Sequence, residues 1–203
     1  IGHWVLLETC RRLQAWRAQG VEIVPIAVNM SAIELRDKSL PARIAAILSE
    51  TGLEAHFLEL EVTESSLMYH ENGASIATLV ELSHLGIRIA IDDFGSGSAS
   101  LKRLKCFPLD TLNIAPCFVN DMLDSVENTS FINALINFGQ NLALRVTAKG
   151  VETQAQLDHL TLQGCDGAQG FLFSKPLSAT DFRALLSPER PKWPLSHLNF
   201  EPT

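Results

Sequence analysis

The stretch from Ile87 to Gly97 reads IRIAIDDFGSG and joins a short apolar run to two adjacent acids and a glycine-rich turn. An apolar run of this kind is typical of a buried parallel β-strand. In α/β barrels the chemistry lies at the C-terminal ends of such strands. The neighbouring carboxylates of Asp92 and Asp93 repel each other unless a cation or a hydrogen-bond donor compensates them. A plain strand-to-turn junction, in which one Asp caps the next helix, accounts for the pair equally well.

Outward from this stretch, strand-like and helix-like segments alternate along the chain. The predicted strands are 22–29, 57–63, 87–91, 110–115, 144–148 and 165–171. The predicted helices are 1–19, 41–50, 71–84, 100–105, 128–142, a helix capped by Thr153 that runs to Leu162, and 181–186. The helix over 128–142 is expected to bury Phe131, Leu135, Phe138 and Leu142. Such alternation predicts a parallel sheet, either a barrel or an open doubly wound sheet.

Polar residues stand at the end of each predicted strand: Asn29, Glu61, Asp92 with Asp93, Asn113, Lys149 and Gln169. In a barrel these strand ends converge on one mouth, which favours the barrel and a site at that mouth. A closed barrel of this type has about eight strand–helix units, and the chain supplies six of them. Either two units precede Ile1, or the sheet closes differently or with another chain.

Composition restricts the class of protein. At 203 residues and 46% hydrophobic, the chain is long enough for one sizeable core. A net charge of −7 argues against a nucleic-acid polymer as the partner. The four cysteines show no metal-ligand spacing, which indicates a reducing compartment, and no signal peptide or apolar run of about 18 residues is visible. We therefore predict a cytoplasmic domain.

The segment 187–203 is rich in proline and has no hydrophobic period. It is interpreted as a tail or linker that follows a domain at 1–186. Trp193 and Phe200 in this segment leave open a docking role toward a partner or a neighbouring domain.

Several motifs, in order, resemble those of the EAL domain family: AVNMSA, LELEVTES, IAIDDFGSGSASL, AKGVET and GCDGAQGFLFSKPL. The resemblance runs from Ile1 to about Leu186 and lacks the N-terminal strand with the Glu-Ala-Leu motif. It implies a TIM-like (β/α) barrel of the EAL type, N-terminally incomplete. Active members hydrolyse the bacterial second messenger cyclic di-GMP to a linear dinucleotide and use two Mg2+ or Mn2+ ions.

The resemblance also implies roles for individual residues. Asn29, Glu61, Asp92 and Asp93 resemble the family's metal-binding residues. Glu64 resembles the residue that steadies the loop after the Asp pair, and Gln169 resembles a glutamine near the nucleotide. Glu152 corresponds to the second Glu of the family's Ala-Glu-Gly-Val-Glu motif.

Other positions depart from the family pattern. Asn113 stands where the family has a Lys, Ala115 where it has an Asp, and Lys149 where it has a metal-binding Glu. Ser98 and Ala99 replace a Tyr-Ser or similar pair, which puts the loop's coupling to activity or dimerisation in doubt.

The Lys149 replacement weighs most, because it puts a positive charge in place of a ligand carboxylate. Two unit charges ~4 Å apart interact by about 4 kcal/mol at an effective dielectric of ~20, here repulsively for a metal ion. The ammonium of Lys149 is expected to pair with Asp92, Asp93 or Glu61 where a metal once lay; the alternative is that Lys149 extends to solvent. No metal cofactor is therefore expected, and Mg2+ or Mn2+ only if the domain is active.

The favoured hypothesis is a catalytically inactive EAL-like domain that binds cyclic di-GMP and signals through contacts with another signalling protein or domain. Its ligand-binding residues are predicted to be Asn29, Glu61, Asp92, Asp93, Lys149, Glu152 and Gln169. One alternative is a protein-interaction domain without ligand. Another is an active metal-dependent phosphodiesterase whose metals lie on Asn29, Glu61, Asp92 and Asp93. A homodimer and a larger, membrane-anchored parent protein remain open.

Overall fold

The computed structural model describes residues 2–68, 74–97 and 104–186 of the chain. The chain forms two compact units, Ile1–Thr111 and Leu112–Thr203. The first unit contains α1 (Gly2–Ala18), β1 (Ile26–Met30), α2 (Ala32–Leu35), α3 (Leu40–Thr51), η1 (Ala55–Phe57), β2 (Leu58–Thr63), α4 (Glu64–Met68), α5 (Ala74–His84) and β3 (Arg88–Phe94). The second contains α7 (Pro116–Asn120), α8 (Val126–Asn141), β5 (Arg145–Lys149), α9 (Gln154–Leu162), β6 (Gly167–Gln169) and α10 (Ala179–Leu185), while β4 (Thr111–Ile114) begins at the boundary.

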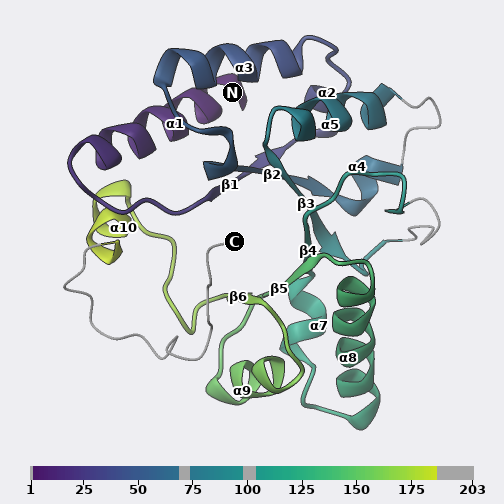
Figure 1. Ribbon diagram of the computed structural model, residues 1–203. Helices are drawn as coiled ribbons and strands as arrows, with labels where there is room; N and C mark the ends of the chain where they lie inside the picture. The colour runs from purple at the N-terminus through teal and green to yellow at the C-terminus, as the bar shows by residue number, and fades with distance from the viewer. Residues whose placement is uncertain (1, 69–73, 98–103, 187–203) are drawn as a thin grey trace. The chain divides into compact units, whose positions relative to one another are not determined.

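The strands of the first unit pair in chain order, and both pairings are parallel (Figure 1). Strand β2 lies between β1 and β3, and the side chains of Leu58, Leu60 and Val62, which share one face, have no exposed surface. The sequence of β2, LELEVT, alternates accordingly, with its apolar side chains on the covered face and Glu59 and Glu61 on the opposite face. Strand β1 begins only after Pro25, because proline has no N–H to donate to a ladder.

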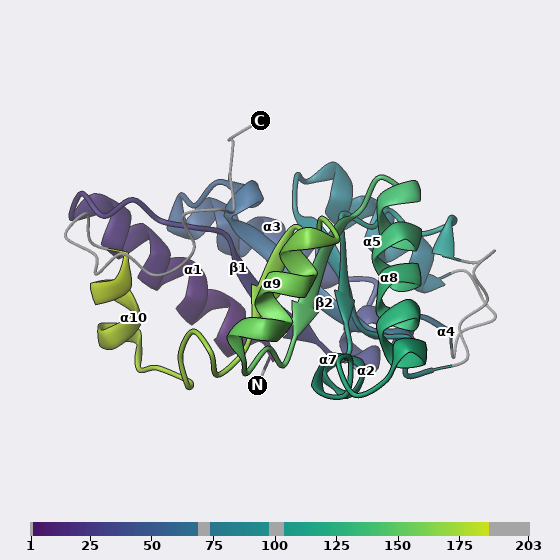
Figure 2. The same ribbon diagram turned by 90° about the horizontal axis from the view of Figure 1, so that it is seen from below.

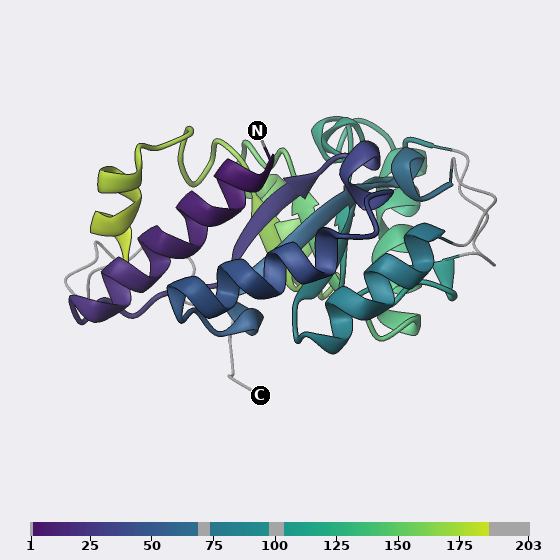
Figure 3. The same cartoon turned by 90° about the horizontal axis from the view of Figure 1, so that it is seen from above.

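Helices α1, α3 and α5 lie on one side of strands β1 to β3, and α1 packs along α3 (Figures 1 and 3). The side of α1 that faces this layer carries Leu6, Cys10 and Leu13, which are all buried. Their spacing of four and three residues places them on one helical face. Helix α3 ends at Gly52, whose φ of +69° is the left-handed conformation that glycine adopts without penalty.

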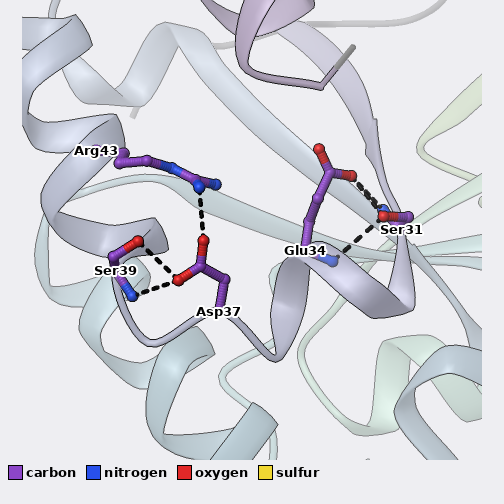
Figure 4. Close-up of polar contacts among 5 residues, drawn as sticks. All are labelled: Ser31, Glu34, Asp37, Ser39 and Arg43. Carbon is purple, nitrogen blue, oxygen red and sulfur yellow. Dashed lines mark hydrogen bonds and ion pairs between the residues drawn. The ribbon is translucent and has the colours of Figure 1, made fainter.

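Two polar clusters fix the connection between β1 and α3 (Figure 4). Ser31 caps α2 by accepting from the backbone N–H of Glu34, and the Glu34 carboxylate accepts from the backbone N–H of Ser31. The Asp37 carboxylate accepts hydrogen bonds from the hydroxyl and the backbone N–H of Ser39 and from the Arg43 guanidinium. These contacts, those of Ser39 above all, hold the pKa of Asp37 below its ordinary value.

In the second unit, β5 and β6 form a parallel pair, and α8 packs along β5 (Figure 2). The face that α8 buries is Ile132, Ile136 and Gly139. A Cβ on Gly139 would lie 2.4 Å from Cγ2 of Val146 in β5, so only glycine allows this close approach. The predicted face was therefore wrong: Phe131 is 44% exposed, because the helix approaches the strand through the face that contains Gly139.

In both units, an aspartate forms two hydrogen bonds with the backbone near the start of a strand. Asp110 accepts a hydrogen bond from the backbone N–H of Ile89 through its carboxylate and donates its own N–H to the Ile89 carbonyl, both at 2.8 Å. Asp166 makes the same two contacts with Val146, at 2.8 and 2.9 Å. An aspartate that precedes one strand thus satisfies backbone groups at the start of the preceding strand.

The predicted order of elements is confirmed over the described residues, with several corrections. Strand β3 continues to Phe94, so Asp92 and Asp93 lie inside the strand rather than after it. Strand β6 spans only three residues, and the short helices α2, α4 and α7 were not predicted. The predicted helix over 100–105 and the segment 187–203 fall mainly or wholly outside the described residues.

Two further predictions concern cysteines and membrane spans. The four cysteines are unpaired, with Cys10 and Cys165 buried and Cys106 and Cys117 exposed. Within residues 2–68, 74–97 and 104–186, no helix combines the length and the hydropathy that a bilayer span requires.

Candidate functional site

Three of the predicted site residues lie on one face of the first unit's strands. Asn29 in β1 is the register partner of Glu61 in β2, and Glu61 is the partner of Ala90 in β3. Asp92 lies two residues beyond Ala90, so side-chain alternation puts it on the same face. Asn29 is exposed, whereas Glu61 and Asp92 are 9% and 8% exposed. The strand register therefore gathers one amide and two carboxylates along the ends of adjacent strands.

The turn from Asp93 to Gly97 is held by hydrogen bonds within the turn and by hydrogen bonds to the side chain of Glu64. Asp93 has a φ of +52°, a left-handed conformation that is uncommon for a residue other than glycine. Its carbonyl accepts from the backbone N–H and the hydroxyl of Ser96. The buried Glu64 carboxylate accepts from the backbone N–H groups of Gly95 and Gly97, at 2.9 and 3.4 Å. These are the contacts that a loop-steadying role of Glu64 requires, and that role stays a prediction.

In the second unit, Lys149 and Gln169 lie side by side at the ends of β5 and β6. The two residues are register partners on parallel strands, so their side chains leave the same face. Lys149 is half-buried and Gln169 is exposed. Next to them, a Cβ on Gly170 would lie 2.0 Å from the Val151 carbonyl oxygen, so this position requires glycine. The arrangement offers an ammonium and a primary amide as adjacent hydrogen-bond donors.

The two other departures from the family pattern lie on β4 and at its end. Asn113 is 2% exposed and Ala115 is 2% exposed. Ala115 occupies the N-cap position of α7 and provides no side-chain cap, although Asp is among the preferred residues there. Each replacement removes a charged side chain relative to the family pattern.

Glu152 follows β5 and is exposed, and its backbone is held by a residue that the sequence analysis missed. Oε1 of Gln156 accepts from the backbone N–H groups of Glu152 and Thr153, at 2.8 and 2.9 Å. Thr153 caps the same helix by accepting from the Gln156 N–H. The spacing Thr-x-x-Gln is a capping-box signature, so the sequence contained the signal for this contact.

The oxygen donors of the first unit, Asn29, Glu61, Asp92 and Asp93, are of the kind that hard cations prefer. Over the part of the chain that the structure describes, however, no three His, Cys, Asp or Glu side chains group as metal ligands do. At the position of a further ligand in the family pattern stands Lys149, a cation. By sequence, the chain therefore lacks one of the carboxylates that the family pattern provides for two divalent ions.

Comparison with known proteins identifies the family. The sequence model of the EAL domain family matches residues 1–176 of this chain. The bifunctional diguanylate cyclase/cyclic di-GMP phosphodiesterase MucR of Pseudomonas aeruginosa is 39% identical over 184 residues, 91% of this chain and 27% of MucR. The cyclic di-GMP phosphodiesterase NbdA of the same organism is 42% identical over 174 residues, 86% of this chain and 22% of NbdA. The chain thus spans about a quarter of the length of these two relatives.

Solved structures agree with this match. The structure titled PaMucR phosphodiesterase, c-di-GMP complex, superposes with a TM-score of 0.84 at 39% identity and covers 90% of this chain and 73% of that chain. The EAL domain of Mycobacterium smegmatis DcpA superposes with a TM-score of 0.87 at 35% identity and covers 95% of this chain and 86% of that chain. The predicted TIM-like α/β fold class is thereby confirmed, and the chain belongs to the EAL domain family.

Proposed function

We propose that this EAL domain binds cyclic di-GMP without a metal ion and does not hydrolyse it. The observation that carries the proposal is the position of Lys149, half-buried at the end of β5 and in register with Gln169. An ammonium is a compact charge with three donors, and a phosphodiester is an anion with only acceptor oxygens. Lys149 can therefore supply to a phosphate the positive charge that a divalent ion supplies in active relatives.

The remaining predicted ligand residues suit the other groups of a dinucleotide. Gln169 donates and accepts through its amide beside Lys149, and Asn29 does so on β1. The carboxylates of Glu61, Asp92, Asp93 and Glu152 accept hydrogen bonds from the N–H groups of a guanine base or from ribose hydroxyls. Similarity to MucR, which is solved in a complex with c-di-GMP, supports the choice of ligand. The protein would then signal through contact with another signalling protein or domain.

Loss of hydrolysis follows from the charges of the substituted side chains. Two-metal hydrolysis needs carboxylates that hold two cations close together, so that one ion activates water and both stabilise the charge that develops on phosphorus. Lys149 opposes a cation by charge, and Asn113 and Ala115 no longer provide the ionic groups that the family pattern has there. We infer that the domain retains recognition and has lost turnover.

Binding and turnover are tested in two assays on the same protein. In EDTA, a filter-binding assay with labelled cyclic di-GMP is expected to show saturable binding. In Mn2+, chromatography after a long incubation is expected to show no linear dinucleotide. Release of the linear dinucleotide that Lys149→Ala or Asp92→Ala abolishes would overturn the proposal in favour of an active phosphodiesterase.

Substitution of Lys149 tests its role in binding. Lys149→Met removes a charge-assisted hydrogen bond, which is worth about 1.5–3 kcal/mol, so affinity in EDTA is expected to fall about ten- to hundredfold. Lys105→Met is the matched control, because Lys105 is exposed and lies outside the motifs. The double variant Lys149→Glu, Asn113→Lys returns two family residues and is expected to bind Mn2+.

A second candidate function is a protein-interaction domain without ligand, and exposed apolar side chains on the α7–α8 hairpin favour it. Leu123, Val126 and Phe131 are 45%, 84% and 44% exposed. The ring of Phe131 contacts that of Phe118 in α7 in a tilted arrangement, with 4.8 Å between the ring centroids. Apolar groups gathered at a surface are typical of protein contacts. Absence of cyclic di-GMP binding both in EDTA and in Mg2+ would favour this function over the first.

A further inference from the structure

Gln156 is a buried glutamine whose side chain forms hydrogen bonds in four directions. It is 6% exposed and lies in the first turn of α9. Its Oε1 accepts from the backbone N–H groups of Glu152 and Thr153 at 2.8 and 2.9 Å. Its Nε2 donates to the carbonyls of Val119 and Asn120 at 3.1 and 3.4 Å. A primary amide has two acceptor lone pairs and two N–H donors, so every polar capacity of this side chain is used.

These four hydrogen bonds join two segments that both follow a strand end. Val119 and Asn120 form the C-terminal end of α7, the helix that follows β4. Glu152 and Thr153 belong to the short connection that follows β5 and leads into α9. Carbonyl groups at the end of a helix and N–H groups before a helix both lack intrahelical partners. One side chain therefore joins the two segments: it accepts from N–H groups that precede α9 and donates to carbonyls at the end of α7, although the Val119 carbonyl also accepts from the backbone N–H groups of Asp121 and Met122.

A second contact holds the other end of α7 against the same connection. Gly150 has a φ of +83°, and a Cβ there would lie 2.8 Å from Cβ of Pro116, the first residue of α7. The backbone at Gly150 thus lies directly against the start of α7, while Gln156 binds its end. The connection that begins after Lys149 is held at two points along one helix.

We propose that Gln156 is a positioning residue for ligand binding, which sets the place of Lys149 and Glu152 through the backbone that it holds. The inference rests on the proposed function, because it concerns the same ligand residues. Gln156 itself touches neither ligand nor phosphate; it binds the backbone at Glu152 and Thr153, three and four residues after Lys149. Displacement of this backbone by a fraction of an ångström would lengthen the hydrogen bond from Lys149 to a phosphate oxygen.

The substitution Gln156→Glu separates positioning from mere packing, because it preserves shape and makes the contact depend on pH. A carboxylate still accepts from the N–H groups of Glu152 and Thr153 but cannot donate to the Val119 carbonyl. When the carboxyl is protonated, it regains one donor. Cyclic di-GMP affinity of this variant, measured in EDTA, is expected to lie about tenfold or more below the wild-type value at pH 8, because the carboxylate then faces the Val119 carbonyl oxygen without a donor. The affinity should rise toward the wild-type value as the pH falls toward the pKa of the introduced carboxyl.

The wild-type protein, titrated over the same pH range, provides the reference. Other titratable groups on these segments are present in both proteins, namely Asp121, Glu152, Asp158 and His159. The ratio of the variant's affinity to the wild-type affinity at each pH therefore reports the effect of the introduced carboxyl group alone. Gln154→Glu is the matched control on the same helix, because Gln154 is exposed and its side-chain amide donates to the Asp158 carboxylate. Its ratio to wild type is expected to stay constant with pH.

Gln156→Met removes all four hydrogen bonds without a charge and covers the case in which Gln156→Glu does not fold. It is expected to bind at least about tenfold more weakly than wild type at every pH, with its folding checked by circular dichroism. A ratio to wild type that is near one for folded Gln156→Met, or near one at pH 8 for folded Gln156→Glu, overturns the inference alone. If wild type itself does not bind, the proposed function fails, and the inference fails with it.

Discussion

Oε2 of Glu64 accepts a hydrogen bond from the backbone N–H of Gly95 at 2.9 Å, although the two residues are 31 positions apart in the chain. The same oxygen accepts a longer bond, of 3.4 Å, from the N–H of Gly97. Because the Glu64 side chain is almost fully buried, it has to be satisfied by the protein rather than by water. The turn after the acidic pair is thus anchored to the residue that starts α4.

Removal of this anchor is expected to destabilise the protein. Glu64→Ala leaves the N–H groups of Gly95 and Gly97 without their acceptor, so the free energy of unfolding should fall by about 1–3 kcal/mol. Urea denaturation followed by circular dichroism measures the change. Glu81→Ala is the control, because Glu81 is exposed on α5, and it should change stability by less than about 0.5 kcal/mol. Equal effects of the two substitutions would contradict the anchoring role.

The contact between Gly97 and Glu64 predicts a non-additive pair of substitutions. A Cβ at Gly97 would lie 2.5 Å from Oε1 of Glu64, so Gly97→Ala should be destabilising in the wild-type protein. In the Glu64→Ala background the clash is absent, and the same substitution should cost less by about 0.5–3 kcal/mol. A double-mutant cycle from urea denaturation measures this coupling, and strict additivity would show that the two residues do not interact.

The hydrogen bonds to Asp37 predict how its titration responds to substitution. Its pKa is held below the ordinary value, first by the Ser39 hydroxyl and backbone N–H and to a smaller extent by Arg43. Ser39→Ala should therefore raise the Asp37 pKa more than Arg43→Gln does, as carboxyl carbon shifts followed by NMR would show. Because the folded pKa is the lower one, the stability that these contacts provide is present above roughly pH 4 and is lost as the pH falls through the folded value. An unchanged Asp37 pKa in Ser39→Ala would contradict this assignment.

The four cysteines are expected to differ in reactivity. Burial raises the pKa of the Cys10 and Cys165 thiols to about 11, and Cys165 also donates to the carbonyls of Val146 and Gly167. The thiolate is the reactive form, so at pH 8 iodoacetamide should label Cys106 and Cys117, which are exposed, long before the buried pair. Peptide mass spectrometry follows each site, and urea should make all four react. Early labelling of Cys10 in the native protein would contradict its burial.

The sequence predicted those elements that a local pattern of apolar or helix-capping residues marks. The strand around Ile89 was predicted from its apolar run, and the strand around Leu60 from the alternation of apolar residues with Glu59 and Glu61. Thr153 was recognised as a helix cap from its position alone, and the structure gives it the expected hydrogen bond to the Gln156 N–H. Strand-end polar residues such as Asn29 and Glu61 were correctly placed as neighbours, because parallel register follows from strand order.

Other features depend on contacts between distant segments and could not be read in this way. Phe131 looked like a core residue by hydropathy, yet α8 approaches β5 through Gly139, and only the packing distance to Val146 decides which face is buried. The extension of β3 through Asp92 follows from its pairing with Thr63 of β2, which the local sequence does not reveal. The anchoring of Gly95 by Glu64 likewise joins positions far apart in the chain.

The central claim is that the positive charge of Lys149 takes the place of metal ions in ligand binding. Calorimetric titration of the protein with cyclic di-GMP, once in EDTA and once in Mg2+, tests it most directly. The account predicts saturable binding in EDTA, with a dissociation constant that Mg2+ leaves unchanged within about twofold, a difference of about 0.4 kcal/mol. Binding that occurs only with Mg2+, or heat from turnover to the linear dinucleotide, would contradict it.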